Sequence, residues 1–257
     1  MWDMLKGRYR RHCRRNGVRA YLTIPFVGCN LVVLSLLIFD QPVSASVLQS
    51  QSVLRVMGAY VTELGKSGWI LFACAILLFE ALSLSRLAHS ATARFHALFI
   101  GQVAAYLLAT VSISGLLVNL AKRLIGRARP LYQTDAGSFS LSPLHGGFQF
   151  ESFPSGHATT VGAILMGFSL LAPRHRPVFL VAAIWLGMTR VLVGAHFPSD
   201  VLAGLTFGAW SSVIIAAIFA RYGFLFEERD TGLPLLKRSL PLKNAVASQG
   251  LSQAGRG

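Results

Sequence analysis

Apolar residues fill six stretches of this chain, and each stretch is close to the length of a membrane-spanning helix. A helix needs about 20 apolar residues to cross a hydrocarbon core roughly 30 Å thick. The stretches are Ala20 to Phe39, Gly68 to Leu87, Ala97 to Leu120, His157 to Ala172, Val178 to Ala195 and Val201 to Ala220. The pattern predicts an all-α integral membrane protein, built as a bundle of six helices.

The composition agrees with this prediction, and the distribution of charged and apolar residues divides the chain into three regions. Of the 257 residues, 53% are hydrophobic and 13% are charged, whereas about a quarter of the residues in a soluble domain are charged. We predict a basic cytoplasmic arm at residues 1–19, a six-span domain at 20–220 and a polar cytoplasmic tail at 221–257. The tail has no apolar stripe of helical spacing, so we expect it to be disordered.

The first apolar stretch allows two interpretations. Its basic flank and the small residues Val43, Ser44 and Ala45 would also suit a signal peptide that is cleaved after insertion. The stretch is long for a signal peptide, which favours a retained span. Both interpretations leave the orientation of the remaining spans unchanged.

The distribution of charge points to an anionic ligand. The formal net charge is +14, but the basic residues lie at the ends of spans and form no stripe with aromatic residues, so we predict no nucleic-acid binding. Most of them fall on the cytoplasmic side if the N-terminus is inside the cell. Seven fall on the outer side, and five of these lie in two places, at Lys122, Arg123, Arg127 and Arg129 and at Arg190. Few carboxylates accompany them, and this imbalance indicates a bound anion.

Three polar clusters stand at the outer ends of spans and should converge on one face of the membrane. They are KRLIGRARP at 122–130, FPSGHATT at 153–160 and RVLVGAHFPSD at 190–200. Lys122 and Arg129 supply positive charge, and Arg190 is costly inside a span without an anionic partner. Ser155 and Gly156 open an apolar helix whose free N–H groups suit an anion.

Two histidines in these clusters are candidates for chemistry. Asp200 can accept a hydrogen bond from one ring nitrogen of His196, which leaves the other nitrogen as a nucleophile. His157 lies in the first turn of its helix, beside whatever binds there. Both histidines and Asp200 could also ligate zinc, but the neighbouring cations would repel a dication, so we predict no metal and no cofactor.

The order and spacing of these residues resemble the three-part sequence pattern of the type 2 phosphatidic acid phosphatase (PAP2) superfamily of membrane lipid phosphatases. The resemblance covers about residues 60 to 220, with Thr189 where many members have serine. It rests on Lys122 followed by six residues and then Arg129-Pro130, on Pro154-Ser155-Gly156-His157, and on Arg190, His196 and Asp200. The resemblance implies a six-helix bundle with its active site at the extracytoplasmic end.

The resemblance also implies a metal-independent reaction through a phosphohistidine. His196 would attack phosphorus, Asp200 would orient His196, and His157 would protonate the leaving oxygen. Other residues would hold the phosphoryl oxygens, namely Lys122, Arg129, Arg190, Ser155 and Gly156. Positive charge and a covalent intermediate are both suited to phosphoryl transfer.

The substrate should be a lipid phosphate, because the polar clusters lie where the headgroup of a bilayer lipid would be. The resemblance implies lipid A, undecaprenyl pyrophosphate, phosphatidylglycerophosphate or phosphatidate, with a likeness to the lipid A branch of Gram-negative bacteria. We therefore predict a multi-pass protein of the bacterial inner membrane, with the bilayer and its lipid substrate as partners and no obligate protein partner. Its active site should face the periplasm.

Two other functions stay open. A phosphotransferase would pass the phosphoryl group from His196 to a lipid hydroxyl instead of water. A non-enzymatic anion transporter would use the cations only to recruit its cargo. Transporters place their sites near the midplane of the membrane, whereas these charges lie at one end of the spans, which favours an enzyme.

Overall fold

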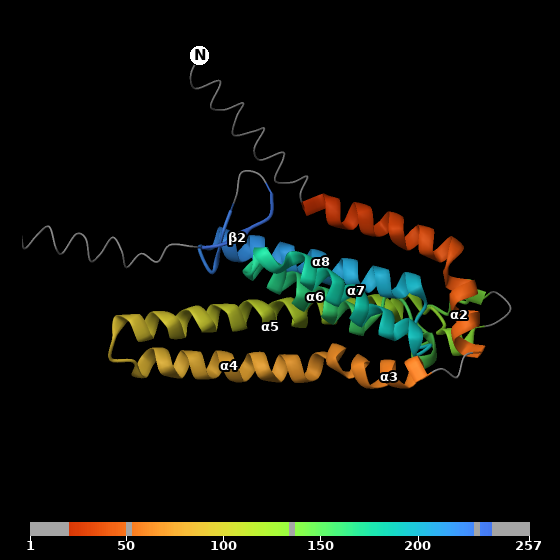
Figure 1. Ribbon diagram of the computed structural model, residues 1–257, viewed down its shortest axis with the longest axis horizontal. Coiled ribbons are helices and arrows are strands. Elements are labelled where there is room, and N and C mark those ends of the chain that lie inside the picture. Colours follow the sequence, from red (N-terminus) through yellow and green to blue (C-terminus); the bar gives the residue numbers. More distant parts are fainter. Residues whose placement is uncertain (1–20, 50–52, 134–136, 229–231, 238–257) are drawn as a thin grey trace, which may run out of the picture.

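The protein is a bundle of long helices that run side by side and are joined by loops at both ends (Figure 1). The computed structural model describes residues 21–49, 53–133, 137–228 and 232–237. The predicted basic arm at residues 1–19 lies outside the described residues. The bundle begins with a first helix at Tyr21–Ile38. The labelled helices follow as α2 (Asp40–Gln49), α3 (Val53–Val61), α4 (Ser67–Leu87), α5 (Ala91–Ile125), α6 (Gly156–Leu171), α7 (Arg176–Leu192) and α8 (Pro198–Arg221).

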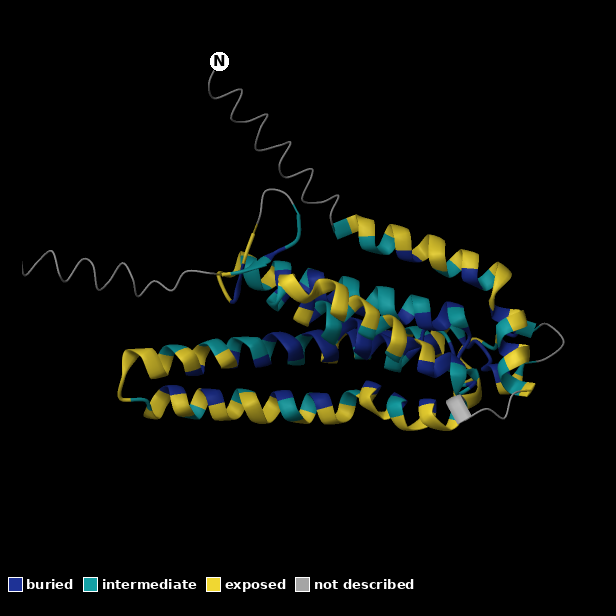
Figure 2. Ribbon diagram, in the orientation of Figure 1, coloured by how far each residue is buried: buried dark blue, intermediate teal, exposed yellow. Residues whose placement is uncertain are grey.

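The described helices agree with a membrane protein. Four helical stretches are long and apolar enough to cross a membrane, namely Tyr21–Ile38, Arg55–Leu87, Ala91–Ile125 and Pro198–Arg221. Large apolar side chains also face outward, and Figure 2 shows exposed residues along the outer faces of the first helix and α4. Helices α6 and α7 occupy the other two predicted spans but have only 16 and 17 residues, about 24 to 26 Å. The count of six spans therefore stays a prediction.

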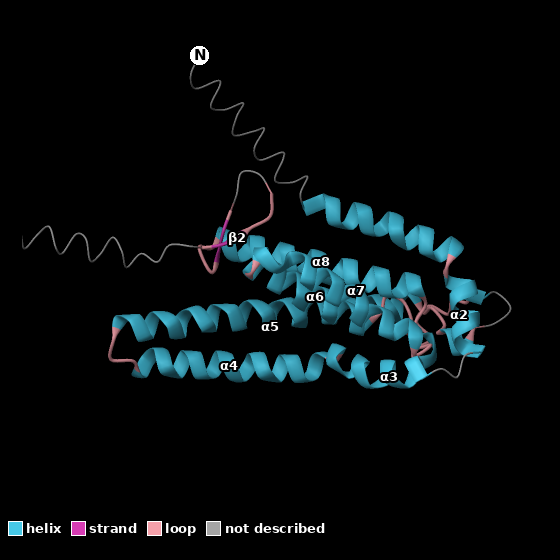
Figure 3. Ribbon diagram, viewed as in Figure 1, coloured by secondary structure: helices cyan, strands magenta, loops and turns pink. Residues whose placement is uncertain are grey.

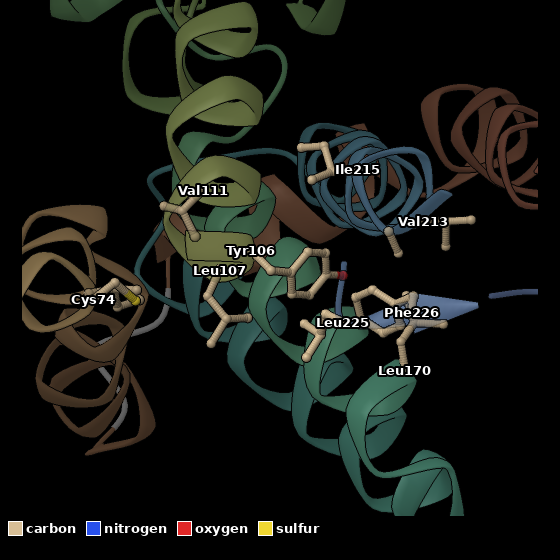
Figure 4. Close-up of a cluster of buried hydrophobic side chains, with 11 residues drawn as sticks. Cys74, Tyr106, Leu107, Val111, Leu170, Val213, Ile215, Leu225 and Phe226 are labelled. Atoms are coloured by element: carbon tan, nitrogen blue, oxygen red, sulfur yellow. The ribbon is translucent and has the colours of Figure 1, made fainter. Parts of the chain in front are cut away.

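The apolar core lies where α5, α6 and α8 meet, toward the end of the bundle that holds the C-terminal strands (Figure 4). Tyr106 is fully buried there, and its hydroxyl lies 2.6 Å from Ser212 Oγ. The ring of Phe226 contacts Tyr106 edge-on, with 4.9 Å between ring centroids. Such edge-to-face pairs add to the stability gained by burial alone.

Phe226 belongs to the segment that we expected to be a disordered tail, and here the structure differs from the expectation. Strand β1 (Phe226–Glu227) pairs antiparallel with β2 (Leu235–Leu236). Leu225 and Phe226 are buried in the core, and burying two large apolar side chains stabilises the fold by several kcal/mol, about 1.5–3 for each. The first part of the tail is therefore ordered, and residues 238–257 lie outside the described part of the chain.

Helices α6 and α8 run parallel and approach each other unusually closely. A Cβ atom added at Gly204 would lie 2.5 Å from the carbonyl oxygen of Ser155, and one at Gly208 would lie 2.1 Å from that of Thr159. Not even the methyl group of alanine fits at these distances, so glycine is required at both positions. Small residues are common where membrane helices touch. The close approach fixes the two helix starts against each other, and the Ser155 N–H donates to the Asp200 carbonyl at 3.0 Å.

The local sequence explains why both helices begin at this end. Ser155 caps α6, because its hydroxyl accepts from the Ala158 N–H. Pro198 starts α8, and the Asp200 carboxylate accepts from the Phe197 N–H at 3.0 Å. Figure 3 shows that the loops between α5 and α6 gather at the same end, close to α2 and α3. Two helix N-termini and the long loop thus meet in one place.

Candidate active site

His196 and Asp200 form a buried pair at the start of α8. His196 lies in the turn before the helix and Asp200 in its first turn, and His196 Nδ1 is 3.6 Å from Asp200 Oδ2. Both side chains are almost completely inaccessible to solvent. Burial lowers the pKa of His196 to about 4, although the hydrogen bond and charge of Asp200 act in the opposite direction. The imidazole is therefore neutral at pH 7, as a nucleophile must be.

Lys122 and His157 lie on the open side of the candidate site. A Cβ atom at Gly156 would lie 3.3 Å from Lys122 Nζ, so glycine lets the ammonium group reach the backbone at the start of α6. His157 lies within range of the positive charges of Arg190 and Lys122. A cavity of about 840 Å³ opens beside these residues, lined by Lys122, Gly156, His157, Thr160, Asn119 and the segment 63–69.

Arg190 and Arg129 supply further positive charge. Arg190 Nη1 donates to Thr62 Oγ1 at 2.9 Å, and its buried Nε has no hydrogen-bond partner among the described residues. Arg129 Nε donates to the Phe148 carbonyl at 2.9 Å, with its guanidinium 3.6 Å from the centre of the Phe148 ring. Burial and the charge of Arg190 lower the pKa of Arg129 to about 10. It stays charged at pH 7.

The structure thus brings all eight predicted residues to one end of the bundle. They come from α5, the loop after it, α6, α7 and the start of α8, at Lys122, Arg129, Ser155, Gly156, His157, Arg190, His196 and Asp200. In the described part of the chain, no carboxylate lies within 4 Å of Lys122, Arg129 or Arg190. Two helix N-termini add partial positive charge. The site is therefore suited to hold an anion beside a neutral imidazole, the arrangement that nucleophilic phosphoryl transfer requires.

A second set of buried polar residues lies behind His196. The sequence singled out only Arg127 among them, as one of the cations that indicated a bound anion, whereas the structure pairs it with carboxylates of the protein. Arg127 Nη1 donates to Asp200 Oδ1 at 2.5 Å, and its Nη2 donates to Asp40 Oδ2 at 2.7 Å. Ser152 Oγ donates to Asp200 Oδ2 at 2.5 Å, and Ser199 Oγ to Asp40 Oδ2 at 2.5 Å. One signal was available in the sequence, because a carboxylate at the end of an apolar span needs a cationic partner.

Comparison with known proteins identifies the family and several relatives of this chain. Residues 103–223 match the model of the PAP2 superfamily. The lipid A 1-phosphatase of Rhizobium johnstonii is 46% identical over 237 residues, which are 92% of this chain and 96% of the relative. The lipid A 1-phosphatase of Rhizobium etli is 48% identical over 216 residues, 84% of this chain and 92% of the relative.

A solved structure shares the fold. The PAP2 type phosphatidylglycerolphosphate phosphatase from Bacillus subtilis superimposes with a TM-score of 0.53 over 80% of this chain and 96% of its own. The two sequences are 23% identical, so this likeness concerns the arrangement of helices alone.

Proposed function

This chain belongs to the PAP2 superfamily and is a lipid phosphatase, and from that premise we propose that it removes the 1-phosphate of lipid A through a phosphohistidine formed on His196. The substrate is supported by two nearly full-length relatives that are named lipid A 1-phosphatases. The mechanism is supported by one observation above all. A buried, neutral His196 is backed by Asp200 and faces cations that have no carboxylate partner in the described chain.

Binding of the phosphate would satisfy these cations. Arg190 and Arg129 are suited to two phosphate oxygens each, because a guanidinium presents parallel N–H donors. Lys122 adds a point charge, and the N–H groups at the start of α6, next to Ser155 and Gly156, bind a further oxygen. The unpartnered Nε of Arg190 supports this proposal, because it is a buried donor with an open hydrogen bond.

The first chemical step forms a bond between nitrogen and phosphorus. His196 Nδ1–H donates to Asp200, and Nε2 attacks the phosphorus as the bond to the sugar oxygen breaks. His157 gives that oxygen its proton, and the negative charge of the bound phosphate favours the protonated form of His157. The dephosphorylated lipid then leaves.

The second step returns the enzyme to its starting state. A water molecule attacks the phosphorus of phosphohistidine, and His157 takes the proton of that water as a general base. The bond between nitrogen and phosphorus breaks, which releases inorganic phosphate and neutral His196. The cations stabilise the charge on the transferred group in both steps.

We also propose that the chain spans the inner membrane six times, with the site on the periplasmic side and the bilayer and its lipid substrate as its partners. The excess of basic residues on the opposite side supports this orientation. The cations of the site are exceptions to the positive-inside rule, and a bound phosphate would account for them. In the membrane, the phosphate of a bilayer lipid lies at the depth of the site.

Phosphate release by the detergent-purified protein tests the proposal. The substrates are lipid A, undecaprenyl pyrophosphate and phosphatidylglycerophosphate, each with wild type, His196→Ala and the control His89→Ala, which alters an exposed histidine between α4 and α5. We expect release from lipid A, with loss of one phosphate by mass spectrometry. His196→Ala should lose activity by about 10⁴-fold or more, as removal of other catalytic nucleophiles does, and His89→Ala should match wild type.

Each other result has a defined meaning. Release from another lipid alone would replace the substrate and keep the mechanism. Full activity in His196→Ala would refute the phosphohistidine. Transfer of the phosphate to a second lipid, without release, would identify a phosphotransferase.

A further inference from the structure

We propose that Asp40 and Arg127 are positioning residues for this reaction, so that the end of the first helix is a working part of the site. The proposal rests on the proposed function, because it assumes that His196 is the nucleophile. Asp40 lies outside the region that matches the family, residues 103–223. No motif in the sequence pointed to it.

Asp40 is completely buried and makes hydrogen bonds to two distant segments. It begins α2, directly after the first helix. Its Oδ1 accepts from the Ser199 N–H at 2.9 Å. Its Oδ2 accepts from Ser199 Oγ at 2.5 Å and from Arg127 Nη2 at 2.7 Å. The carboxylate thus holds the first turn of α8, one residue before Asp200.

Arg127 has a protein partner on each of its three side-chain nitrogens. Nε donates to the Ser138 carbonyl at 2.8 Å, and Nη1 donates to both Ser199 Oγ and Asp200 Oδ1. Its guanidinium carbon lies 4.3 Å from the centre of the Phe197 ring. The charge of Arg127 is therefore neutralised within the protein, and the guanidinium is not available to a phosphate.

The balance of charge explains what Asp40 contributes. Asp40, Arg127 and Asp200 together carry one net negative charge, which faces His196 through Asp200. When His196 attacks phosphorus, its ring becomes positively charged, and this negative charge stabilises it. Without the charge of Asp40, Arg127 would neutralise Asp200. The ring would then lose most of that stabilisation while the phosphate cations stay in place.

The proposal also decides between the two interpretations of the first span. Cleavage after Ala45 would remove Asp40 and leave Arg127 with an unsatisfied buried donor, which costs about 1–3 kcal/mol or more for a charged group. We therefore infer that the active enzyme retains the first helix.

The test compares Asp40→Asn with Glu80→Gln, which removes one negative charge from an exposed position on α4. Asparagine keeps the size of the side chain and an acceptor for Ser199. We expect kcat per folded enzyme to fall about 10- to 100-fold, the range seen when an outer partner that orients a metal-ligating side chain is lost. KM should change less than about twofold, because the phosphate cations are intact. Glu80→Gln should keep the kcat and KM of wild type.

Several outcomes would overturn the proposal. A purely structural Asp40 would lower the yield of folded protein and leave kcat per folded enzyme unchanged. An Asp40→Asn variant with higher KM and unaltered kcat would assign Asp40 to binding. The intact mass of purified, active wild type gives an independent result that needs no variant, because an active enzyme that begins after residue 45 refutes the proposal.

Wild type and His196→Ala run beside these variants keep the two proposals distinct. If His196→Ala is inactive and Asp40→Asn is fully active, the role of Asp40 is refuted and the proposed function stands. If His196→Ala retains activity, both fail. If wild type prefers another lipid, the same comparison is made with that lipid.

Discussion

Arg127 and Arg190 lie at the same end of the bundle, and both are buried, with exposures of 3% and 9%. Their surroundings differ. Arg127 forms ion pairs with Asp40 and Asp200 and has a partner on each nitrogen. Arg190 has a neutral partner, Thr62, and one unpartnered nitrogen in the described structure. The two arginines are alike in residue type and in burial. They differ in their hydrogen-bond partners, and this difference is the basis for proposing different functions for them.

The difference shows how to distinguish a buried cation that stabilises the structure of a site from one that binds a ligand. A buried charge is costly unless it is paired. Where the pairing is complete within the protein, removing the cation destabilises the fold. Where it is incomplete, the ligand supplies the missing partner, and removing the cation weakens binding and catalysis. Three experiments test whether this distinction holds.

The largest effect should come from Arg127→Ala. The substitution leaves Asp40 and Asp200 buried without their cation, which costs about 3–5 kcal/mol in comparable buried ion pairs. We expect a much lower thermal midpoint in detergent and a low yield of folded protein. Arg86→Ala, at an exposed position in the last turn of α4, should change stability by less than about 0.5 kcal/mol. A stable Arg127→Ala protein would remove the basis of the comparison.

Arg190→Ala should show the opposite behaviour. Its loss breaks one hydrogen bond to a neutral hydroxyl, so the thermal midpoint should stay near that of wild type. We expect kcat/KM to fall about 10²- to 10³-fold, which is typical for removal of one group that stabilises a transition state. Arg190→Lys, which keeps the charge but not the paired donors, should be intermediate. Unfolding of Arg190→Ala, with normal activity of the folded fraction, would contradict the assignment to the ligand.

The smallest effect concerns the pH dependence of kcat/KM. Burial lowers the pKa of His196 to about 4, and the charges of Arg129 and Arg190 contribute in the same direction. Below its pKa the ring is protonated and cannot attack, so the acid limb due to His196 should lie near pH 4. In Arg190→Ala, loss of a positive neighbour should move this limb to higher pH.

One correction is needed before this limb is assigned. The phosphate of the substrate itself loses a proton near pH 6, and its ionisation can be followed by ³¹P NMR in the same micelles. A limb near pH 6.5 that remains after correction would show that His196 is not held neutral by burial.

Local patterns were enough to predict the residues that we propose hold the phosphate, because these stand in short motifs at the ends of apolar spans, and the structure brings them to one end of the bundle. Lys122, His157 and His196 were all found in this way. The Asp40–Arg127 pair could not be found by spacing, because its members are 87 residues apart and meet only after the bundle has formed. The order of β1 was also missed, since it depends on Phe226 packing against Tyr106, a contact between segments distant in sequence.

The contact between α6 and α8 shows a similar limit of prediction from the sequence. The apolar runs located α5, α6, α7 and α8, which carry most of the candidate site, but not α2, which carries Asp40. They did not reveal that α6 and α8 touch through Gly204 and Gly208, because a glycine in an apolar run has the same appearance whether it packs against a helix or faces lipid. Its meaning depends on the partner helix.

The distance along the chain between Asp40 and Ser199, 159 residues, has a consequence for the newly made protein. Ribosomes add about 5 to 20 residues per second, so about 8 to 32 s separate the synthesis of these two residues. Asp40 lacks its partner Ser199 throughout this interval. It lacks Arg127 until 87 of those residues have been added. The contact between Asp40 and Ser199 can therefore form only after residue 199 has been made, so a site that depends on Asp40 is inactive in any shorter nascent chain.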